Sequence, residues 1–182
     1  MKRFTVSAVV VFVYLLSSVA LADAYGDLKK AQAAFLSARS WHAEEHLSNG
    51  KTVQVDFSAP DRWRIQPTPT MTEVVIGSDV YMIQGGHSMK MPMGGMMISR
   101  MIKQFQLADD PDVKKTAQDL GTQTLDGRTV RVYSYTVRGV PETIYLGDDS
   151  LPVQAVVKNS AATTVVNYSK YNEPIAIEAP AS

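Results

Sequence analysis

Residues 41–57 read WHAEEHLSNGKTVQVDF and decide the fold. Apolar and polar side chains alternate on both sides of an Asn-Gly pair at positions 49 and 50, and Val53, Val55 and Phe57 share one face of the second half. A period of two is typical of a strand that buries one face. Asn-Gly is the strongest short signal for a hairpin turn. The stretch therefore predicts an antiparallel hairpin.

The first half of this hairpin also matches a metalloprotease pattern. Residues 42–46 read HAEEH, which fits H-x-x-E-H, a motif that needs both histidines on one face of a helix. In a strand, His42, Glu44 and His46 share one face and Glu45 points to the other. We therefore expect a polar strand face and no zinc protease. A weak surface metal site at His42 and His46 is the alternative.

The alternating pattern recurs along the rest of the chain. Further strands are predicted at residues 62–65, 73–76, 80–84, 130–137, 143–146, 153–158 and 163–171, with a last edge strand at 174–178. Asp126-Gly127 marks another hairpin turn. Short alternating runs between turn signals predict an antiparallel meander of about nine to eleven strands.

A helix is expected before the hairpin, at residues 27–40 (DLKKAQAAFLSARS), with Asp27 as its N-cap. Its apolar residues recur at helical spacing and form one stripe: Leu28, Ala31, Phe35 and Ala38. Because the opposite side is polar, this helix must dock on an apolar surface.

A methionine-rich block separates the two runs of strands. Residues 87–101 read HSMKMPMGGMMISRM and contain six of the nine methionines. Gly85 and Gly86 are expected to break the sheet, and Pro92, Gly94 and Gly95 are expected to act as hinges. From residue 96 the apolar period becomes helical, which predicts an extended flap, a short amphipathic lid helix and then a polar connector at 109–115.

Three interpretations of the methionine block follow from its chemistry. Flexible, polarisable thioethers suit a gate for apolar ligands of varied shape, or a core filler. Thioethers are also soft ligands for Cu(I), and a histidine stands beside them. The candidate copper ligands are His87, Met89, Met91, Met93, Met96 and Met97.

Composition excludes several classes of function. The 182 residues include 18 basic and 18 acidic ones, so no strong field attracts nucleic acid. There is no cysteine, which excludes disulfides, thiolate metal sites and a lipid-modified N-terminal cysteine. We find no nucleophile elbow and no phosphate-binding glycine loop. We expect no enzyme and no cofactor.

The N-terminus has the features of an export signal. Lys2 and Arg3 precede an apolar run at 6–16, and Ala20-Leu21-Ala22 fits a cleavage site. We expect cleavage between Ala22 and Asp23 and one soluble domain at 23–182, in the periplasm if the source is a Gram-negative bacterium. The alternative is an uncleaved anchor.

Five motifs, in this order and spacing, carry a family resemblance. They are Pro60–Arg64 (PDRWR), Ile76–Tyr81 (IGSDVY), Leu125–Gly127 with Val132-Tyr133, Leu151–Val153 (LPV) and Tyr168–Pro180 (YSKYNEPIAIEAP). Over roughly residues 25–180 the chain resembles the LolA-like superfamily of periplasmic lipoprotein carriers, lipid-binding lipoproteins and envelope-stress sensor domains.

This resemblance implies a mainly β, α+β fold. An unclosed antiparallel β-barrel, one curved sheet, would wrap around the N-terminal helix and the central lid helix and leave an apolar cavity. It also implies lipid or acyl-chain binding without catalysis. The chain departs from the lipoprotein carriers at Tyr81–Gln84, where they have a tryptophan and a tyrosine. Arg62 and Arg64 match only the superfamily pattern, not the carriers' ligand-contacting arginine.

The expected function is that of a periplasmic carrier that holds a lipid or lipoprotein acyl chain behind a methionine-rich flap. The expected cavity and lid residues are Phe35, Trp63, Met82, Met91, Met93, Met97, Met101, Ile102 and Phe105. Expected partners are a lipid or acylated lipoprotein and a membrane-protein donor or acceptor, with no nucleic acid and a monomeric state. The alternatives are a periplasmic Cu(I)-binding protein and an envelope-stress sensor or interaction module.

Overall fold

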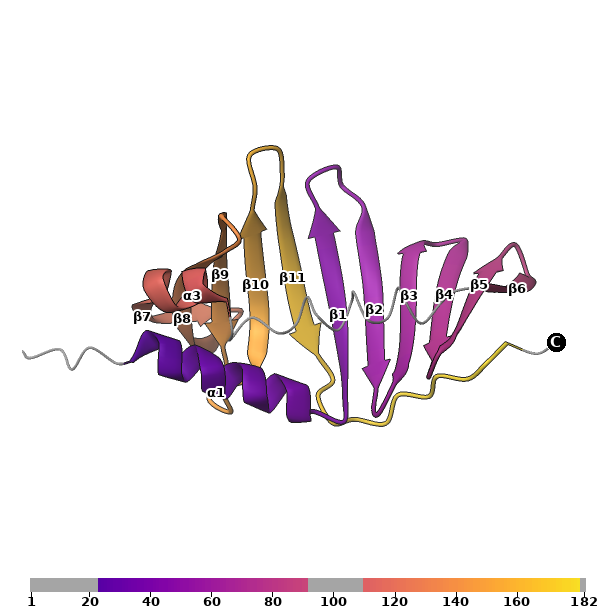
Figure 1. Cartoon of the computed structure of the whole chain (residues 1–182), viewed down its shortest axis with the longest axis horizontal. Coiled ribbons are helices and arrows are strands. Elements are labelled where there is room, and N and C mark those ends of the chain that lie inside the picture. Colours follow the sequence, from indigo (N-terminus) through magenta and orange to yellow (C-terminus); the bar gives the residue numbers. More distant parts are fainter. Residues whose placement is uncertain (1–22, 92–109, 181–182) are drawn as a thin grey trace, which may run out of the picture.

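A computed structural model describes residues 23–91 and 110–180. The predicted hairpin is confirmed: Trp41 lies opposite Phe57 and Ala43 opposite Val55, and Gly50 adopts the positive φ (+78°) that its turn requires. These two strands stand at the centre of one sheet (Figure 1).

The sheet contains eleven strands, all paired antiparallel, in the order β6-β5-β4-β3-β2-β1-β11-β10-β9-β8-β7. Their bounds are β1 (Ser40–Leu47), β2 (Thr52–Ser58), β3 (Arg62–Thr68), β4 (Met71–Ile76), β5 (Asp79–Gln84), β6 (His87–Met91), β7 (Gln118–Leu125), β8 (Arg128–Val137), β9 (Val140–Leu146), β10 (Pro152–Lys158) and β11 (Thr163–Ser169). The pairing of β1 with β11 joins two meanders. The end strands β6 and β7 are not paired with each other, so the sheet is unclosed, as predicted.

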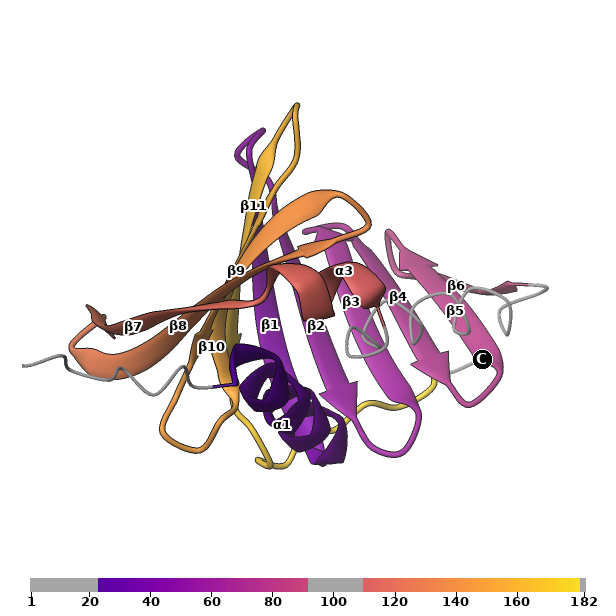
Figure 2. The same cartoon turned by 60° about the vertical axis from the view of Figure 1, so that its left-hand side comes forward.

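Helices α1 (Ala24–Ser37) and α3 (Pro111–Thr116) lie on the same side of the curved sheet (Figure 2). We call this side the inner face; it carries Trp41, Ala43 and Glu45 of β1, and the outer face carries His42, Glu44 and His46. No helix in the described ranges is long and apolar enough to cross a membrane.

Helix α1 begins earlier than predicted. Asp23 caps it, with its carboxylate accepting a hydrogen bond from the Gly26 N–H at 3.0 Å, so the predicted N-cap at Asp27 is wrong. Asp27 instead lies in the first turn and accepts a hydrogen bond from the Tyr133 hydroxyl at 2.9 Å. The predicted apolar stripe is confirmed, because all four of its residues are buried.

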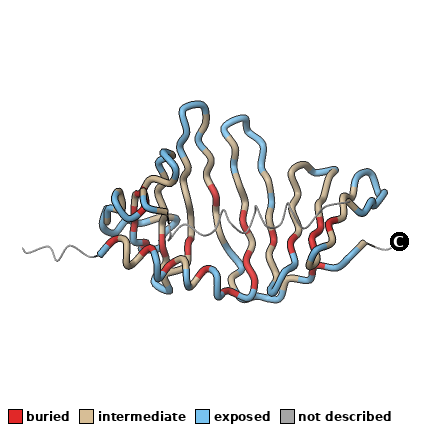
Figure 3. Tube along the Cα trace, viewed as in Figure 1, coloured by how far each residue is buried: buried red, intermediate tan, exposed pale blue. Residues whose placement is uncertain are grey.

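Buried residues lie along α1 and on strands of both meanders (Figure 3). Two core clusters result. One contains Phe35, Ala38, Trp41, Ala43, Trp63, Val75, Val80 and Val166; the other contains Ala24, Leu28, Ala31, Val113, Tyr133, Tyr135 and Leu146. Helix α1 contributes to both clusters, so its docking connects the two meanders.

Several local predictions are wrong. Gly85 and Gly86 do not break the sheet. Both have positive φ and form the turn between β5 and β6. These two strands are paired, with Gln84 opposite His87 next to the turn. The connector at 109–115 contains helix α3, because the Asp110 carboxylate accepts from the Asp112 N–H and proline occupies the first turn.

The C-terminal edge strand is also wrong: residues 174–178 form no strand. The carbonyls of Ala176 and Ile177 accept hydrogen bonds from the guanidinium groups of Arg64 and Arg62, at 3.3 and 2.8 Å. Side chains of β3 therefore hold this segment. The predicted lid helix lies outside the described residues.

Candidate functional site: an apolar cavity under helix α1

A cavity of about 170 Å³ lies between α1 and strands β8 to β11. Helix α1 contributes its apolar stripe, and the sheet contributes inner-face side chains; among them are Leu28, Ala31, Phe35, Ile144, Ala155, Val157 and Val166. The space exists because small side chains face each other here, with Ala31 on the helix and Ala155 on β10.

The size of the cavity limits what it holds in this conformation. Apolar cavities of about 150 Å³ stay dry and accept small apolar molecules, whereas pockets for whole drug-sized ligands measure about 300–1,000 Å³. The cavity of about 170 Å³ therefore fits a small apolar group or part of a chain. A whole acyl chain requires α1 to move away from the sheet.

One carboxyl group stands among these apolar walls. Glu142 lines the cavity on β9, directly opposite Tyr135 of β8, and the Tyr135 hydroxyl hydrogen-bonds its carboxyl group. Burial raises the pKa of Glu142, although the hydrogen bond from Tyr135 acts in the opposite direction. Burial, together with the nearby Glu142, raises the pKa of Tyr135 well above its usual value.

A second carboxyl group, Glu45 of β1, faces the same side of the sheet. Glu45 lies opposite Val166, one of the cavity residues, and burial raises its pKa. Tyr168, also in the cavity wall, has a raised pKa because of burial and of the charges of Glu45 and Glu142. In the described ranges neither carboxyl group has a cationic side chain within ion-pair distance.

Both carboxyl groups were missed as site residues. The alternating pattern of each strand could have identified them. Glu45 shares a face with Trp41 and Ala43, and Glu142 shares one with Ile144 and Leu146. A charged residue at an inward position of an otherwise apolar alternation marks a buried polar site.

Two exposed lysines, one on α1 and one on α3, lie near Tyr25 of the cavity lining. Lys29 lines the cavity but is exposed, and its ammonium lies 5.7 Å from the centre of the Tyr25 ring. The Lys114 ammonium lies 6.0 Å from the same ring. Both distances are within the range of a cation–π contact.

An aromatic cluster closes one end of the cavity. It consists of Phe35, Trp41, Phe57, Trp63, Tyr168 and Tyr171, with the ring centres of Phe35 and Tyr168 5.6 Å apart and those of Phe57 and Trp63 4.7 Å apart. Offset and edge-on ring pairs at such separations stabilise each other beyond their area of burial.

The structure places the predicted ligand residues as follows. Phe35 lines the cavity, and Trp63 packs beside Phe35 in the adjoining core cluster. Met91 packs against the same core cluster from β6, and Met82 lies half-buried on β5 opposite Glu73. The five others, Met93, Met97, Met101, Ile102 and Phe105, lie outside the described residues.

The copper hypothesis stays a prediction. His87, Met89 and Met91 alternate along β6 and therefore share one face, with His87 exposed and the Met89 side chain 61% exposed. The other three candidate ligands, Met93, Met96 and Met97, lie outside the described residues.

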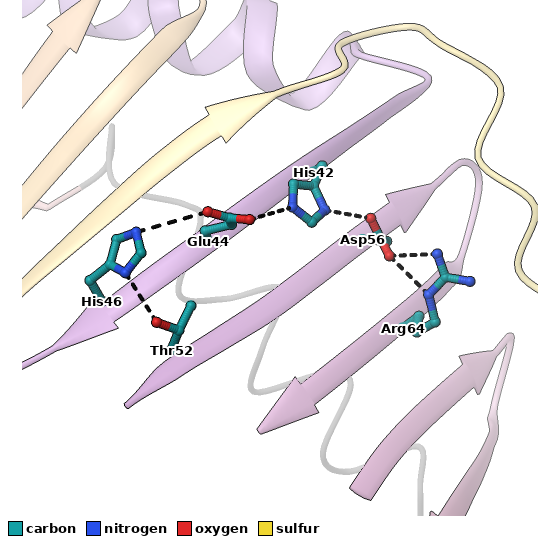
Figure 4. A network of polar contacts seen from close by, with 6 residues as sticks. All are labelled: His42, Glu44, His46, Thr52, Asp56 and Arg64. Atoms are coloured by element: carbon teal, nitrogen blue, oxygen red, sulfur yellow. Dashed lines mark hydrogen bonds and ion pairs between the residues drawn. The ribbon is translucent and has the colours of Figure 1, made fainter. Parts of the chain in front are cut away.

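The H-x-x-E-H residues occupy a strand, as predicted, and form a polar network on the outer face (Figure 4). His42 Nδ1 lies 2.7 Å from Asp56 Oδ1, and the Arg64 guanidinium donates to Asp56 Oδ2 at 2.7 and 2.9 Å. Glu44 lies between the Nε2 atoms of His42 and His46, at 3.6 and 3.9 Å. In the part of the chain that the structure describes, no three His, Asp or Glu side chains form a metal-binding group.

Known proteins share this architecture. No family model and no curated protein matches the chain. Among solved structures, the lipoprotein LppX of Mycobacterium tuberculosis matches 85% of this chain and 98% of its own, with a TM-score of 0.64 and 15% identity. LprF from Mycobacterium bovis matches 88% of this chain and 98% of its own, with a TM-score of 0.66 and 16% identity.

This chain has a LolA-like fold. MucB, solved in a complex with MucA from Pseudomonas aeruginosa, is a further neighbour at a TM-score of 0.52 and 19% identity; the match covers 85% of this chain but only 59% of the solved one. The LolA-like resemblance found in the sequence is thus confirmed at the level of the fold.

Proposed function

We propose that this protein is a non-catalytic, exported carrier that binds a lipid or the acyl chain of a lipoprotein. The observation that carries the proposal is the apolar cavity between the stripe of α1 and the inner face of β8 to β11. The fold shared with the lipoproteins LppX and LprF supports it. The signal at residues 1–22 and the compartment it implies, a periplasm, belong to the same proposal.

Loading of a whole chain would proceed by displacement of α1. Only one face of this helix is buried, and it ends at Ser37 just before β1, where a small change in backbone angles would swing it. Moving the stripe from the sheet exposes apolar side chains, each worth about 1.5–3 kcal/mol when buried. A bound acyl chain offsets this cost by covering the same surface.

The cavity is tested by filling it. Ala155→Trp places an indole into the space from β10, and Val156→Trp, the control, places it on the outer face of the same strand. Binding of the neutral apolar probe N-phenyl-1-naphthylamine, followed by fluorescence, is expected to fall at least about tenfold in Ala155→Trp only. Equal binding by both variants and the parent would count against the cavity as the binding site.

The methionine-rich segment is proposed as the gate of this site. The proposal rests on the sequence, in which Pro92, Gly94 and Gly95 stand among the methionines. Met97→Glu with Met101→Glu places two charges on the expected stripe and should weaken probe binding while the far-UV circular dichroism of the sheet stays the same. If the probe binds to the double variant as tightly as to the parent, the methionine-rich segment is not the gate of the cavity.

A sensor or interaction module is the second candidate. It is favoured by the structural similarity to MucB, which was solved together with MucA. A carrier delivers its cargo to an acceptor, whereas a sensor changes its affinity for a protein partner when the cavity is filled. Pull-down with and without added lipid distinguishes the two.

A further inference from the structure

Most side chains that line the cavity are apolar, but the lining also contains one acidic residue, Glu142, and one basic residue, Lys29. Glu142 of β9 lines the cavity opposite the buried Tyr135 of β8, and the exposed Lys29 lines it from α1. Tyr168 of β11 also lines the cavity, and Glu45 of β1 lies opposite the lining residue Val166. A polar group of the cargo that reaches the β8–β9 part of the cavity therefore meets a carboxyl group.

The hydrogen-bonding capacity of Glu142 is not exhausted. A carboxylate has about four acceptor positions, and Tyr135, opposite it in the ladder, supplies one donor. Leaving a carboxylate without a positive partner in apolar surroundings is costly, and no basic side chain of the described ranges forms an ion pair with Glu142 or Glu45. A ligand that donates hydrogen bonds, above all a positively charged one, removes this cost.

We propose that Glu142, oriented by Tyr135, selects cargo whose polar end donates hydrogen bonds, best a primary ammonium group, and rejects cargo that ends in a carboxylate. The inference deepens the proposed function and rests on it, because it names the substrate class of the same cavity. An ammonium group meets Glu142 with a charge-assisted hydrogen bond, a hydroxyl group with a neutral one, and a carboxylate with repulsion. Lys29 also lines the cavity, but its side chain is exposed and forms no ion pair with Glu142 in the described structure.

The test uses three ligands with the same chain and different ends. Dodecylamine, dodecanol and dodecanoate, each below its micelle concentration at pH 7, compete with N-phenyl-1-naphthylamine for the exported protein. We expect dodecylamine to bind at least about tenfold more tightly than dodecanoate, with dodecanol between them. In Glu142→Gln, which keeps the size of the side chain, the ratio of amine to carboxylate affinity should fall to within about threefold.

The matched control is Glu44→Gln on the outer face of β1, which changes the net charge equally but lies away from the cavity. Glu44→Gln should have the same ratio of amine to carboxylate affinity as the parent, because we expect this ratio to depend on a carboxyl group in the cavity and not on the net charge of the protein. Glu45→Gln is expected to reduce the ratio partly.

The outcomes separate the two proposals. If the three ligands bind equally to the parent, or if Glu142→Gln and Glu44→Gln have the same effect on the ratio, the headgroup inference is overturned and the carrier proposal stands. If neither the probe nor any of the ligands binds to the parent, the carrier proposal fails and the inference fails with it.

Discussion

At the scale of single residues, Asp56 has the densest set of polar contacts on the outer face. Its carboxylate is buried and binds both His42 and the Arg64 guanidinium, and Arg64 in turn donates to the Ala176 carbonyl. Asp56 therefore links β1, β2 and β3 with the C-terminal segment. Sequence alternation places these residues on one face, but it does not show that they touch.

We expect Asp56→Asn to lower the free energy of unfolding by about 2 kcal/mol, because the amide keeps the shape but leaves Arg64 without its counter-charge. The exposed fraction of the Arg64 side chain, 38%, keeps the loss below that of a fully buried pair. Urea unfolding at pH 7 measures it. Asp148→Asn, in an exposed turn, is the control and should change stability by less than about 0.5 kcal/mol; an equal loss in both variants would contradict the role of the network.

Ionisable residues give stability two opposite dependences on pH. Burial raises the pKa of Glu142 and Glu45 above their usual 4.5. Above that value the folded chain holds more protons than the unfolded one, so the free energy of unfolding falls as the pH rises.

Burial also opposes ionisation of Asp27, but hydrogen bonds from Tyr133 and Lys30 outweigh it, and the pKa of Asp27 is lowered below 3.8. The hydrogen bond from Arg131 lowers the pKa of Asp119 likewise. The stabilisation from both aspartates is present above pH 3.8 and is lost below it.

The variant Glu142→Gln cannot ionise and should flatten the decline of stability between pH 4.5 and neutral pH. Urea midpoints measured at intervals from pH 4.5 to 7.5 check this, with Glu44→Gln as the control that keeps the slope of the parent. Parallel curves for the parent and both variants would show that Glu142 does not titrate differently in the folded state.

At the scale of elements, α1 is held on the sheet by its apolar stripe, together with the hydrogen bond from Tyr133 to Asp27 in its first turn. Phe35 is buried at the point where the cavity meets the aromatic cluster, whereas the adjacent Leu36 side chain is 53% exposed. Neighbouring positions on one helix thus have opposite surroundings, because successive residues are 100° apart around the axis.

Phe35→Ala is expected to cost about 3–5 kcal/mol, since it removes a buried ring and leaves a cavity. Leu36→Ala, on the same helix, should change stability by about 0.5 kcal/mol or less. Thermal and urea unfolding measure both. A comparable loss in the two variants would mean that α1 docks in another orientation.

Strand β7, which the sequence patterns did not predict, has the features of a sheet edge. Gly121 has a positive φ of 82°, the register shifts between Asp119 and Thr122, and most of its residues are exposed. A bulged, polar edge strand discourages pairing with other chains. With no buried face it has no apolar alternation, which is why periodicity does not reveal it.

At the scale of the whole molecule, the sheet divides into a centre and two edges. Strands β2, β1, β11 and β10 are paired on both sides and lie far from the sheet edges. Edge strands β6 and β7 are paired on one side only in the described structure. The cavity lies nearer to the β7 end, between α1 and β8 to β11.

We expect amide hydrogen exchange to be slowest in β1 and β11 and fastest in β6 and β7, because opening an edge disrupts fewer contacts. Saturation with dodecanol should slow exchange in α1 and β8 to β11 and leave β3 to β5 unchanged. Protection gained only in β3 to β5 would place the ligand at the other half of the sheet.

The sequence by itself determined much of the local structure. Alternation predicted most strands, the Asn-Gly and Asp-Gly pairs predicted two turns, and helical spacing predicted the buried stripe of α1. These signals are local, since they depend on the period of side chains along one element. The order of five weak motifs also indicated the LolA-like fold.

Only the tertiary structure decided where these elements meet. The cavity joins α1 to strands that follow it by about a hundred residues, and no periodicity records which residues face each other across that separation. The same holds for the pairing of β1 with β11, and for the C-terminal segment that Arg62 and Arg64 hold without a strand. Glu45 and Glu142 are visible in the sequence as inward charges, but only the folded sheet brings the charges of both close to Tyr168 of the cavity wall.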